Sequence, residues 1–428
     1  MSRRHLCFFF VFVLGCVEAK AGLHTVTILH ISDYHSHAAA LPRAIGYLRH
    51  EKKSGALIFS GGDMINKGSP AWSDKYQCAE WPWLNGIVDA MALGNHDMDY
   101  GRAAFDRCRA KLRYPILSAN TGGMQKTAVV SAGGVRVGVF AVAGSDFSTL
   151  VKAEGVTFGD PVDAARQAVR DLREREHVDA VVMIGHEHIN DDFALARAVP
   201  GIDVIFGTHS HLARELTQIE GTRTWFISPS QYLEYISRVE LTVDDHHVTR
   251  MAGRLVPVDE HLPIDKTIAR TVARMQRDLE RDPQYAPLFE PIARLAQPMS
   301  VEDLGKRTLE IMRGAAHADL AISTASSFRQ PLPAGTITLE DLRNAMPYDN
   351  EIVVVEMTYE ELQKLFDASA AEEPLIGQRP TANGQRLRVA TTDYLANAAT
   401  RYRSFSASHQ LVRTGLHVRE AVRISFAP

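Results

Sequence analysis

Side chains able to bind a metal ion follow several short apolar runs of this sequence, at the points where the runs end. The run 87–93 is followed by Gly94-Asn95-His96-Asp97-Met98-Asp99. Other runs end in the same way, and the polar residues after them are Asp33 and His35, Asp63, His186, and His209 with His211. Apolar runs of this length predict buried strands, and open α/β sheets bind ligands at the carboxyl ends of their strands. Carboxylate, amide and imidazole groups together suit Zn, Mn, Fe or Co.

The order of these motifs is more informative than any one of them. A lone Asp-x-His or Gly-Asn-His-Asp is weak evidence, because Asp and His at strand ends often cap loops. Here Asp-x-His, Gly-Asp, Gly-Asn-His-Asp, a strand-end His and Gly-x-His-x-His follow one another along the chain. This ordered set resembles the signature of calcineurin-like metallophosphoesterases, which implies a phosphoester hydrolase with two divalent metal ions.

The resemblance also implies a role for each of these side chains. Asp33, His35 and His211 would hold the first cation, and Asn95, His186 and His209 the second. Two cations roughly 3.5 to 4 Å apart repel each other, so a shared carboxylate must lie between them, and we assign that role to Asp63. Because Asn95 is uncharged, it would leave the second cation electron-poor, and water bound to that cation would be more acidic. The implied reaction is in-line attack on phosphorus by a metal-bound hydroxide.

His96 and Asp99 form a second motif beside the expected metals. Asn-His-x-x-Asp is similar to the catalytic dyad of 5'-nucleotidases, in which His96 would donate a hydrogen bond or proton to the phosphoryl group and Asp99 would orient its ring. The alternative is that His96 only packs behind the metals. We expect Asp97 to support the loop, and His37 and His188 to lie outside the set of metal ligands.

Length and composition limit the possible number of domains, partners and fold classes. The chain has 428 residues, 45% of them hydrophobic, which predicts two soluble domains. Its formal net charge of −4 gives no basic surface for a nucleic acid polymer. Strands alternate with amphipathic helices such as 41–53 up to residue 256, which predicts an α/β fold. The resemblance to calcineurin-like metallophosphoesterases implies that residues 23–256 form a sandwich with α-β-β-α layers.

The rest of the chain has a separate pattern. Residues 257–298 have helical apolar spacing and many charges, and we predict a solvated linker helix that allows hinge motion. Residues 299–428 are predicted as a smaller α+β substrate domain. The run 345–358 and the segment 389–405 are similar to parts of the 5'-nucleotidase carboxyl-terminal domain, which implies nucleotide binding between the domains. Candidate substrate contacts are Arg329, Tyr394 and Phe328.

This second domain departs from the family pattern. Thr324-Ala325-Ser326-Ser327-Phe328-Arg329 stands where the family has a glycine-rich loop, and only the arginine is kept. Ala398-Ala399-Thr400 replaces Gly-Gly-Asp near the end. Tyr394 has two interpretations, a ring stacked on the nucleotide base or a half-buried strand residue.

The first 22 residues are typical of a signal peptide, with Arg3 and Arg4 before the apolar run 6–14. A lipobox would place a lipid anchor on Cys16, whereas Ala19-Lys20-Ala21 would allow simple cleavage. Either route predicts a periplasmic or cell-surface protein whose only membrane contact is the anchor.

In an oxidising compartment Cys78 and Cys108 could form a disulfide; alternatively Cys108 is a buried helix residue.

The sequence thus predicts an exported, two-metal phosphomonoesterase for nucleotides. The alternative substrates are 2',3'-cyclic nucleotides, nucleotide sugars or a non-nucleotide phosphate, which the altered 324–329 loop favours. A surface binding protein without turnover is a further alternative, and it conflicts with the intact set of predicted ligands.

Overall fold

The computed structural model describes residues 22–367, 374–380, 386–396 and 410–426. Residues 1–21 of the predicted signal peptide, including Cys16, lie outside this range, as do residues 397–405 of the segment similar to the nucleotide-binding part of the family. Within the described part of the chain, no helix is both long enough and apolar enough to cross a membrane.

The first domain contains two six-stranded mixed sheets. The first sheet has the order β12-β11-β1-β2-β3-β4 and the second has the order β5-β6-β7-β8-β10-β9. The strands of the first sheet are β1 His24–Ile31, β2 Leu57–Ser60, β3 Ala90–Ala92, β4 Ile116–Leu117, β11 Tyr235–Asp244 and β12 His247–Pro257. Those of the second are β5 Thr127–Ala132, β6 Val135–Phe140, β7 Ala180–Met183, β8 Val204–Phe206, β9 Ala213–Gln218 and β10 Trp225–Pro229. Strands β1 to β4 are parallel, and so are β6, β7, β8 and β10.

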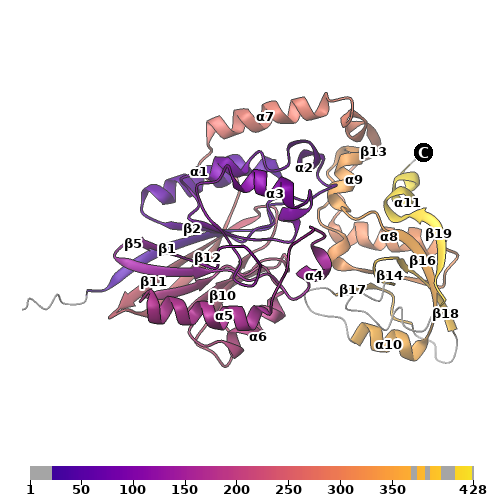
Figure 1. The fold of residues 1–428 in the computed structure, drawn as a ribbon. Coiled ribbons are helices and arrows are strands. Elements are labelled where there is room, and N and C mark those ends of the chain that lie inside the picture. Colours follow the sequence, from indigo (N-terminus) through magenta and orange to yellow (C-terminus); the bar gives the residue numbers. More distant parts are fainter. Residues whose placement is uncertain (1–21, 368–373, 381–385, 397–409, 427–428) are drawn as a thin grey trace, which may run out of the picture.

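The two sheets pack face to face and helices cover their outer faces. Ile28, Phe59 and Val137 are among the fully buried residues between the sheets. The first sheet is covered by α1 Leu41–Lys53, α2 Ala71–Tyr76, α3 Arg102–Arg109 and α7 Lys266–Glu280. The second is covered by α5 Pro161–Arg170 and α6 Ile189–Ala198 (Figure 1). The α-β-β-α sandwich predicted from the sequence is confirmed.

Short helical segments connect these elements. The single-turn segments are η1 Ala38–Ala40, η2 Trp81–Leu84, η3 His96–Met98, α4 Phe147–Leu150, η5 Ala286–Phe289 and η6 Ala325–Ser327. A π-helical turn, η4 Asp171–Arg175, extends α5.

The predicted linker helix is wrong in two respects. Helix α7 ends at Glu280, and residues 291–295 form strand β13 (Pro291–Leu295), which pairs with a strand of the second domain. The helix is also not fully solvated, because Ile268, Met275 and Leu279 are buried in the first-domain core. These apolar residues form one stripe of the helix, and that stripe is enough to pack α7 on α1 and α2 despite its many charges.

The second domain is smaller and has a five-stranded, mostly antiparallel sheet with helices on both faces, which agrees with the predicted α+β class. Its sheet has the order β17-β14-β18-β16-β19, and β15 pairs with β13 separately. The strands are β14 Leu320–Thr324, β15 Gly335–Thr338, β16 Glu351–Thr358, β17 Leu375–Gly377, β18 Arg386–Thr392 and β19 Val412–His417. Helices α8 Val301–Ala315, α9 Leu339–Ala345 and α11 Val418–Ser425 cover one face, and α10 Tyr359–Asp367 covers the other.

Helix α9 joins the second domain to the first. Oε1 of Glu340 accepts a hydrogen bond of 2.7 Å from the backbone N–H of Ala71, and Oγ of Ser69 donates to the carbonyl of Arg343 over 3.1 Å. The guanidinium of Arg343 also donates to the carbonyl of Gly68. These contacts hold the second domain against the edge of the sandwich.

A disulfide joins Cys78 to Cys108 within the first domain. Cys108 is also buried on α3 beside Phe105, so the helix-face interpretation describes its surroundings correctly. The bond ties α3 to the segment after α2.

Candidate metal centre

The predicted metal ligands converge at one rim of the sandwich. The loops after β1, β2 and β3 of the first sheet carry some of them, and the loops after β7 and β8 of the second sheet carry the others. They are Asp33, His35, Asp63 and Asn95 from the first sheet and His186, His209 and His211 from the second. The carboxyl ends of parallel strands lie at one edge of each sheet, and the packing of the two sheets brings these edges together.

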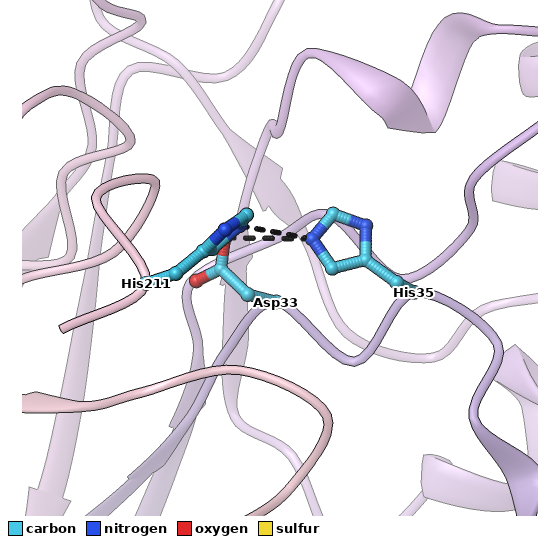
Figure 2. Close-up of side chains that lie close together, drawn as sticks. All are labelled: Asp33, His35 and His211. Carbon is cyan, nitrogen blue, oxygen red and sulfur yellow. Dashed lines mark hydrogen bonds and ion pairs between the residues drawn. The ribbon is translucent and has the colours of Figure 1, made fainter. Parts of the chain in front are cut away.

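Asp33, His35 and His211 form the first cluster (Figure 2). Nε2 of His211 lies 3.1 Å from Oδ1 of Asp33 and 3.1 Å from Nε2 of His35. Nε2 of His35 lies 3.9 Å from the same Asp33 oxygen. Three potential donor atoms thus point at one small volume, in the combination expected around a Zn, Mn, Fe or Co ion.

Asp63, His186 and His209 form the second cluster. Oδ2 of Asp63 lies 3.2 Å from Nε2 of His186 and 4.0 Å from Nε2 of His35, so this carboxylate stands between the two clusters. Nδ1 of His186 donates to the carbonyl of Gly61 over 2.6 Å, which directs Nε2 toward Asp63. A carboxylate in this position could be shared by two cations.

Asn95 supplies an independent test of whether these residues fit a metal. Its Oδ1 is buried and has no hydrogen-bond partner among the described residues. A buried amide oxygen without a partner costs free energy, so such an atom calls for an ion or another ligand. The donor set and this unpartnered oxygen both fit a pair of divalent cations.

The backbone of these loops is strained at the clustered residues. Asp33, His35 and Asp63 have φ values of 49°, 49° and 50°, and His209 and His211 have values of 55° and 58°. A positive φ is unfavourable for residues other than glycine and persists where the surroundings enforce it, typically at functional sites. The strain therefore indicates that the loops are shaped to aim these side chains.

Burial and charge set the protonation of the clusters. Burial lowers the pKa of His35 and of His211 well below the usual histidine value, so both rings are neutral and can bind a metal. Burial opposes protonation of His186 as well, but Asp63 raises its pKa to about 9. A cation that binds His186 must therefore displace a proton, which makes metal uptake dependent on pH.

His96 and Asp99 lie beside Asp63, and the ring of His96 is grouped with Asp63 and His35. Nδ1 of His96 donates to Oδ2 of Asp99 over 2.8 Å, and the backbone N–H of His96 donates to Oδ1 of Asp63 over 2.8 Å. Burial opposes protonation of His96, but Asp63 and Asp99 raise its pKa to about 10. Asp97 accepts hydrogen bonds from the backbone of Asp63, Met64 and Gly94, which confirms its predicted supporting role in the loop.

Arg329 reaches the rim from the second domain. Its guanidinium contacts Nδ1 of His211 and donates to Oε1 of Gln231 over 3.1 Å and to the hydroxyl of Tyr348 over 3.4 Å. Its charged group also lies 5.7 Å from the centre of the Tyr348 ring. Sequence reasoning did not single out Tyr348, although Pro347-Tyr348-Asp349-Asn350 lies within the run similar to the family.

The other two predicted substrate contacts differ in exposure. Tyr394 is 47% exposed and lies just after β18, close to the start of β16, where the backbone N–H of Asp393 donates to Glu351. Phe328 is only 6% exposed and packs in the second-domain core beside Gly305 of α8. The predicted substrate contact of Phe328 does not match this placement, because its apolar ring is used to fill the core.

Three further residues lie against the clusters. The ring of His37 stacks on Tyr232 with 3.7 Å between centroids, outside the ligand clusters as expected. Asp146, which precedes α4, has its Oδ2 3.2 Å from Nε2 of His188 and 3.4 Å from Nε2 of His209. Sequence reasoning missed Asp146, although it follows the apolar run 139–143 after two residues, as Asp63 follows its own run after Gly61-Gly62. That position was the signal that could have found it.

Two family models match the chain. A model described as calcineurin-like phosphoesterase matches residues 26–213, and one described as 5'-nucleotidase, C-terminal domain, matches residues 292–401. The sandwich and its clustered metal-type ligands are those of a calcineurin-like metallophosphoesterase, a class that uses divalent metal ions. With the second domain, the chain belongs to the 5'-nucleotidase family.

Curated relatives agree with this assignment. The trifunctional nucleotide phosphoesterase protein YfkN of Bacillus subtilis is 24% identical over 406 residues, a match that covers 81% of this chain and 28% of that much longer protein. A 5'-nucleotidase of Vibrio cholerae is 24% identical over 443 residues, covering 84% of this chain and 79% of the relative.

Solved structures share the fold over nearly the whole chain. A 5'-nucleotidase precursor from Thermus thermophilus superposes with a TM-score of 0.73 at 20% identity, covering 94% of this chain and 96% of the other. The sulfate thiohydrolase SoxB of Thermus thermophilus superposes with a TM-score of 0.71 at 17% identity, covering 94% of both chains. At these identities the likeness concerns the fold alone.

Proposed function

We propose that this protein is an exported, two-metal phosphomonoesterase that hydrolyses nucleotides at the rim of the first domain. The observation that carries the proposal is the position of Asp63 between two histidine clusters, with His96 and Asp99 directly beside it. Asp33, His35 and His211 would hold one cation, Asn95, His186 and His209 the other, and Asp63 would touch both. When bound, these cations supply Lewis acidity toward a phosphoryl oxygen and lower the pKa of water to roughly 7.

The imidazole of His96 is the side chain that would contact the phosphoryl group of the substrate. The hydrogen bond from its Nδ1 to Asp99 fixes the ring and leaves Nε2 for the phosphoryl group or the leaving oxygen. A protonated ring at this position donates a hydrogen bond to negative charge that grows during phosphoryl transfer. Asp99 keeps the ring in that orientation.

Arg329, Tyr348 and Tyr394 are the proposed substrate contacts from the second domain. Arg329 presents a planar guanidinium that can bind two oxygens of a phosphate at once. Tyr348 lies before β16 and Tyr394 after β18, and these strands pair in antiparallel fashion, so both tyrosines stand at the same end of the sheet. They are 41% and 47% exposed, which suits aromatic rings that stack on a base.

Export is part of the proposal. The positively charged start, the apolar run 6–14 and the candidate cleavage sites at Cys16 and at Ala19-Lys20-Ala21 support it. The Cys78–Cys108 disulfide adds a second argument, since structural disulfides persist in oxidising compartments such as the periplasm or cell surface.

A substrate panel tests the function. Metal-free protein is reconstituted in turn with Zn, Mn, Fe or Co, and phosphate release is measured from AMP, a 2',3'-cyclic nucleotide, a nucleotide sugar and glycerol phosphate. The proposal predicts metal-dependent hydrolysis with the highest kcat/KM for AMP. Preference for another compound would reassign the substrate, and no turnover with any metal would favour a binding protein instead.

A further inference from the structure

Asp146 lies on a loop that the first domain builds tightly against the second cluster. The backbone N–H of Gly144 donates to the carbonyl of His186 over 2.9 Å, which anchors the loop beside that predicted ligand. A Cβ at Gly144 would lie 2.9 Å from Oδ1 of Asp146 and 3.2 Å from Cβ of Glu187. A side chain at Gly144 would displace the carboxylate, so the glycine permits the close approach.

The carboxylate of Asp146 faces two histidines. Its Oδ2 lies 3.4 Å from Nε2 of His209 and 3.2 Å from Nε2 of His188, whose rings are 4.3 Å apart. Asp146 is the residue before α4, but its side chain makes no capping hydrogen bond to that helix. The fold itself therefore does not explain why a carboxylate stands here.

The contact with His209 has a chemical consequence. A neutral imidazole that donates from Nε2 keeps its lone pair on Nδ1, so the bond to Asp146 decides which nitrogen of His209 can bind a cation. His209 belongs to the cluster with Asp63 and His186, and its ring lies 5.1 Å from that of His186. A histidine that bonds a carboxylate through one nitrogen and a metal through the other is oriented and made more basic.

The negative charge of Asp146 would also affect how strongly this cluster binds a cation. Among the groups assigned to the second cation, Asn95 and the two histidine rings are neutral when bound, and Asp63 is shared with the first cation. A second carboxylate just outside the ligands would offset positive charge that the ligands leave uncompensated.

We propose that Asp146 is a positioning residue that orients His209 and raises the affinity of the second metal site. The inference rests on the proposed two-metal function and adds a residue to it. His188 shares the same carboxylate oxygen but is not needed for this role, because its removal leaves the bond between Asp146 and His209 in place.

The test compares Asp146→Asn, Asp146→Ala and His188→Ala with the wild-type protein. Zinc content after dialysis and competition with a chelator give the number of sites and the affinity of each. We expect two cations per wild-type chain, a second site weakened about 10 to 100-fold in both Asp146 variants, and an unchanged second site in His188→Ala. The absorption spectrum of bound Co²⁺ should change at the second site only. Metal-free variants should remain folded, since the Asp146 side chain does not cap a helix.

Other results separate the ways in which the inference can fail. Wild-type affinity in both Asp146 variants would overturn the positioning role while leaving the two-metal function intact. A third cation in the wild-type chain, lost in His188→Ala, would make Asp146 a direct metal ligand instead. A wild-type chain that binds no cation would overturn this inference together with the proposed function.

Discussion

The Nδ1 atom of His96 lies 2.8 Å from Oδ2 of Asp99, three residues further along the chain. The turn η3 (His96–Met98) makes this possible, because residues three apart lie on the same side of a helical turn. The pair sits next to Asp63, at the point where the loops of the two sheets meet.

Removal of the His96 ring should impair chemistry without removing the metals. We expect His96→Ala to lower kcat by about 10² to 10⁴-fold, the usual contribution of an acid or base in the transition state, with unchanged metal content. Asp99→Asn should lower kcat less, because the ring remains but its orientation is no longer fixed. Steady-state kinetics and metal analysis measure both effects, with the exposed His261→Ala as control. Wild-type kcat in His96→Ala would assign His96 to packing alone.

Loss of the Arg329 guanidinium should weaken substrate binding more than catalysis. A hydrogen-bonded charge is worth about 1.5 to 3 kcal/mol, so Arg329→Ala should raise KM at least about 10-fold. Arg329→Lys should restore only part of the affinity, because an ammonium cannot bind two oxygens as a planar fork does. The exposed Arg313→Ala on α8 is the matched control. An unchanged KM in Arg329→Ala would show that Arg329 does not contact the phosphate.

Glu80 should make stability depend on pH. Its carboxyl is buried and accepts hydrogen bonds from Tyr34 and Trp72, and burial raises its pKa from 4.5 to about 7. Below about pH 4.5 both the folded and the unfolded state are protonated at this position. As pH rises toward 7 the unfolded state loses its proton first, so stability falls and then levels off above about pH 7.

Glu80→Gln should remove this part of the pH dependence. Relative to wild type, the variant should gain on the order of 3 kcal/mol in the free energy of unfolding between pH 4.5 and 7.5. Urea unfolding of metal-free protein at several pH values measures the difference, with the exposed Glu302→Gln as control. Parallel curves for wild type and Glu80→Gln would mean that the Glu80 carboxyl is ionised in the folded protein.

The disulfide should stabilise the fold without affecting the site. The bonded cysteines are 30 residues apart, and closing a loop of that length stabilises a protein by about 3 to 4 kcal/mol in the chain-entropy model. Reduction, or the double variant Cys78→Ala with Cys108→Ala, should lower the urea midpoint and leave the metal content unchanged. Equal midpoints for the oxidised and reduced protein would contradict this prediction.

The sequence predicted the site better than it predicted the connections around it. Abrupt changes from apolar runs to Asp, His or Asn locate strand ends, and parallel strands bring such ends to one edge. The convergence of Asp33 with Asp63 within one sheet, and of His186 with His209 within the other, therefore followed from local patterns, whereas the meeting of the two sheet edges did not. The positive φ values of Asp33 and Asp63 left no sign in the sequence, because these positions are not glycines.

Features that depend on distant partners were missed or mispredicted. The charge-rich helix α7 was expected in solvent, but its apolar stripe meets α1, a helix more than 200 residues earlier in the chain. Asp146 contacts His209 only because two separate loops meet, and Phe328 is buried by residues of α8. Composition and spacing within a segment do not contain this information, since burial depends on what packs against the segment.

Counting and locating bound cations tests the central claim most directly. Wild-type protein loaded with zinc should contain two ions per chain, and anomalous diffraction should place them about 3.5 to 4 Å apart with the carboxylate of Asp63 between them. Asp63→Asn should weaken both sites at once. A single ion, or two ions in separate pockets with Asp63 bound to neither, would contradict the account.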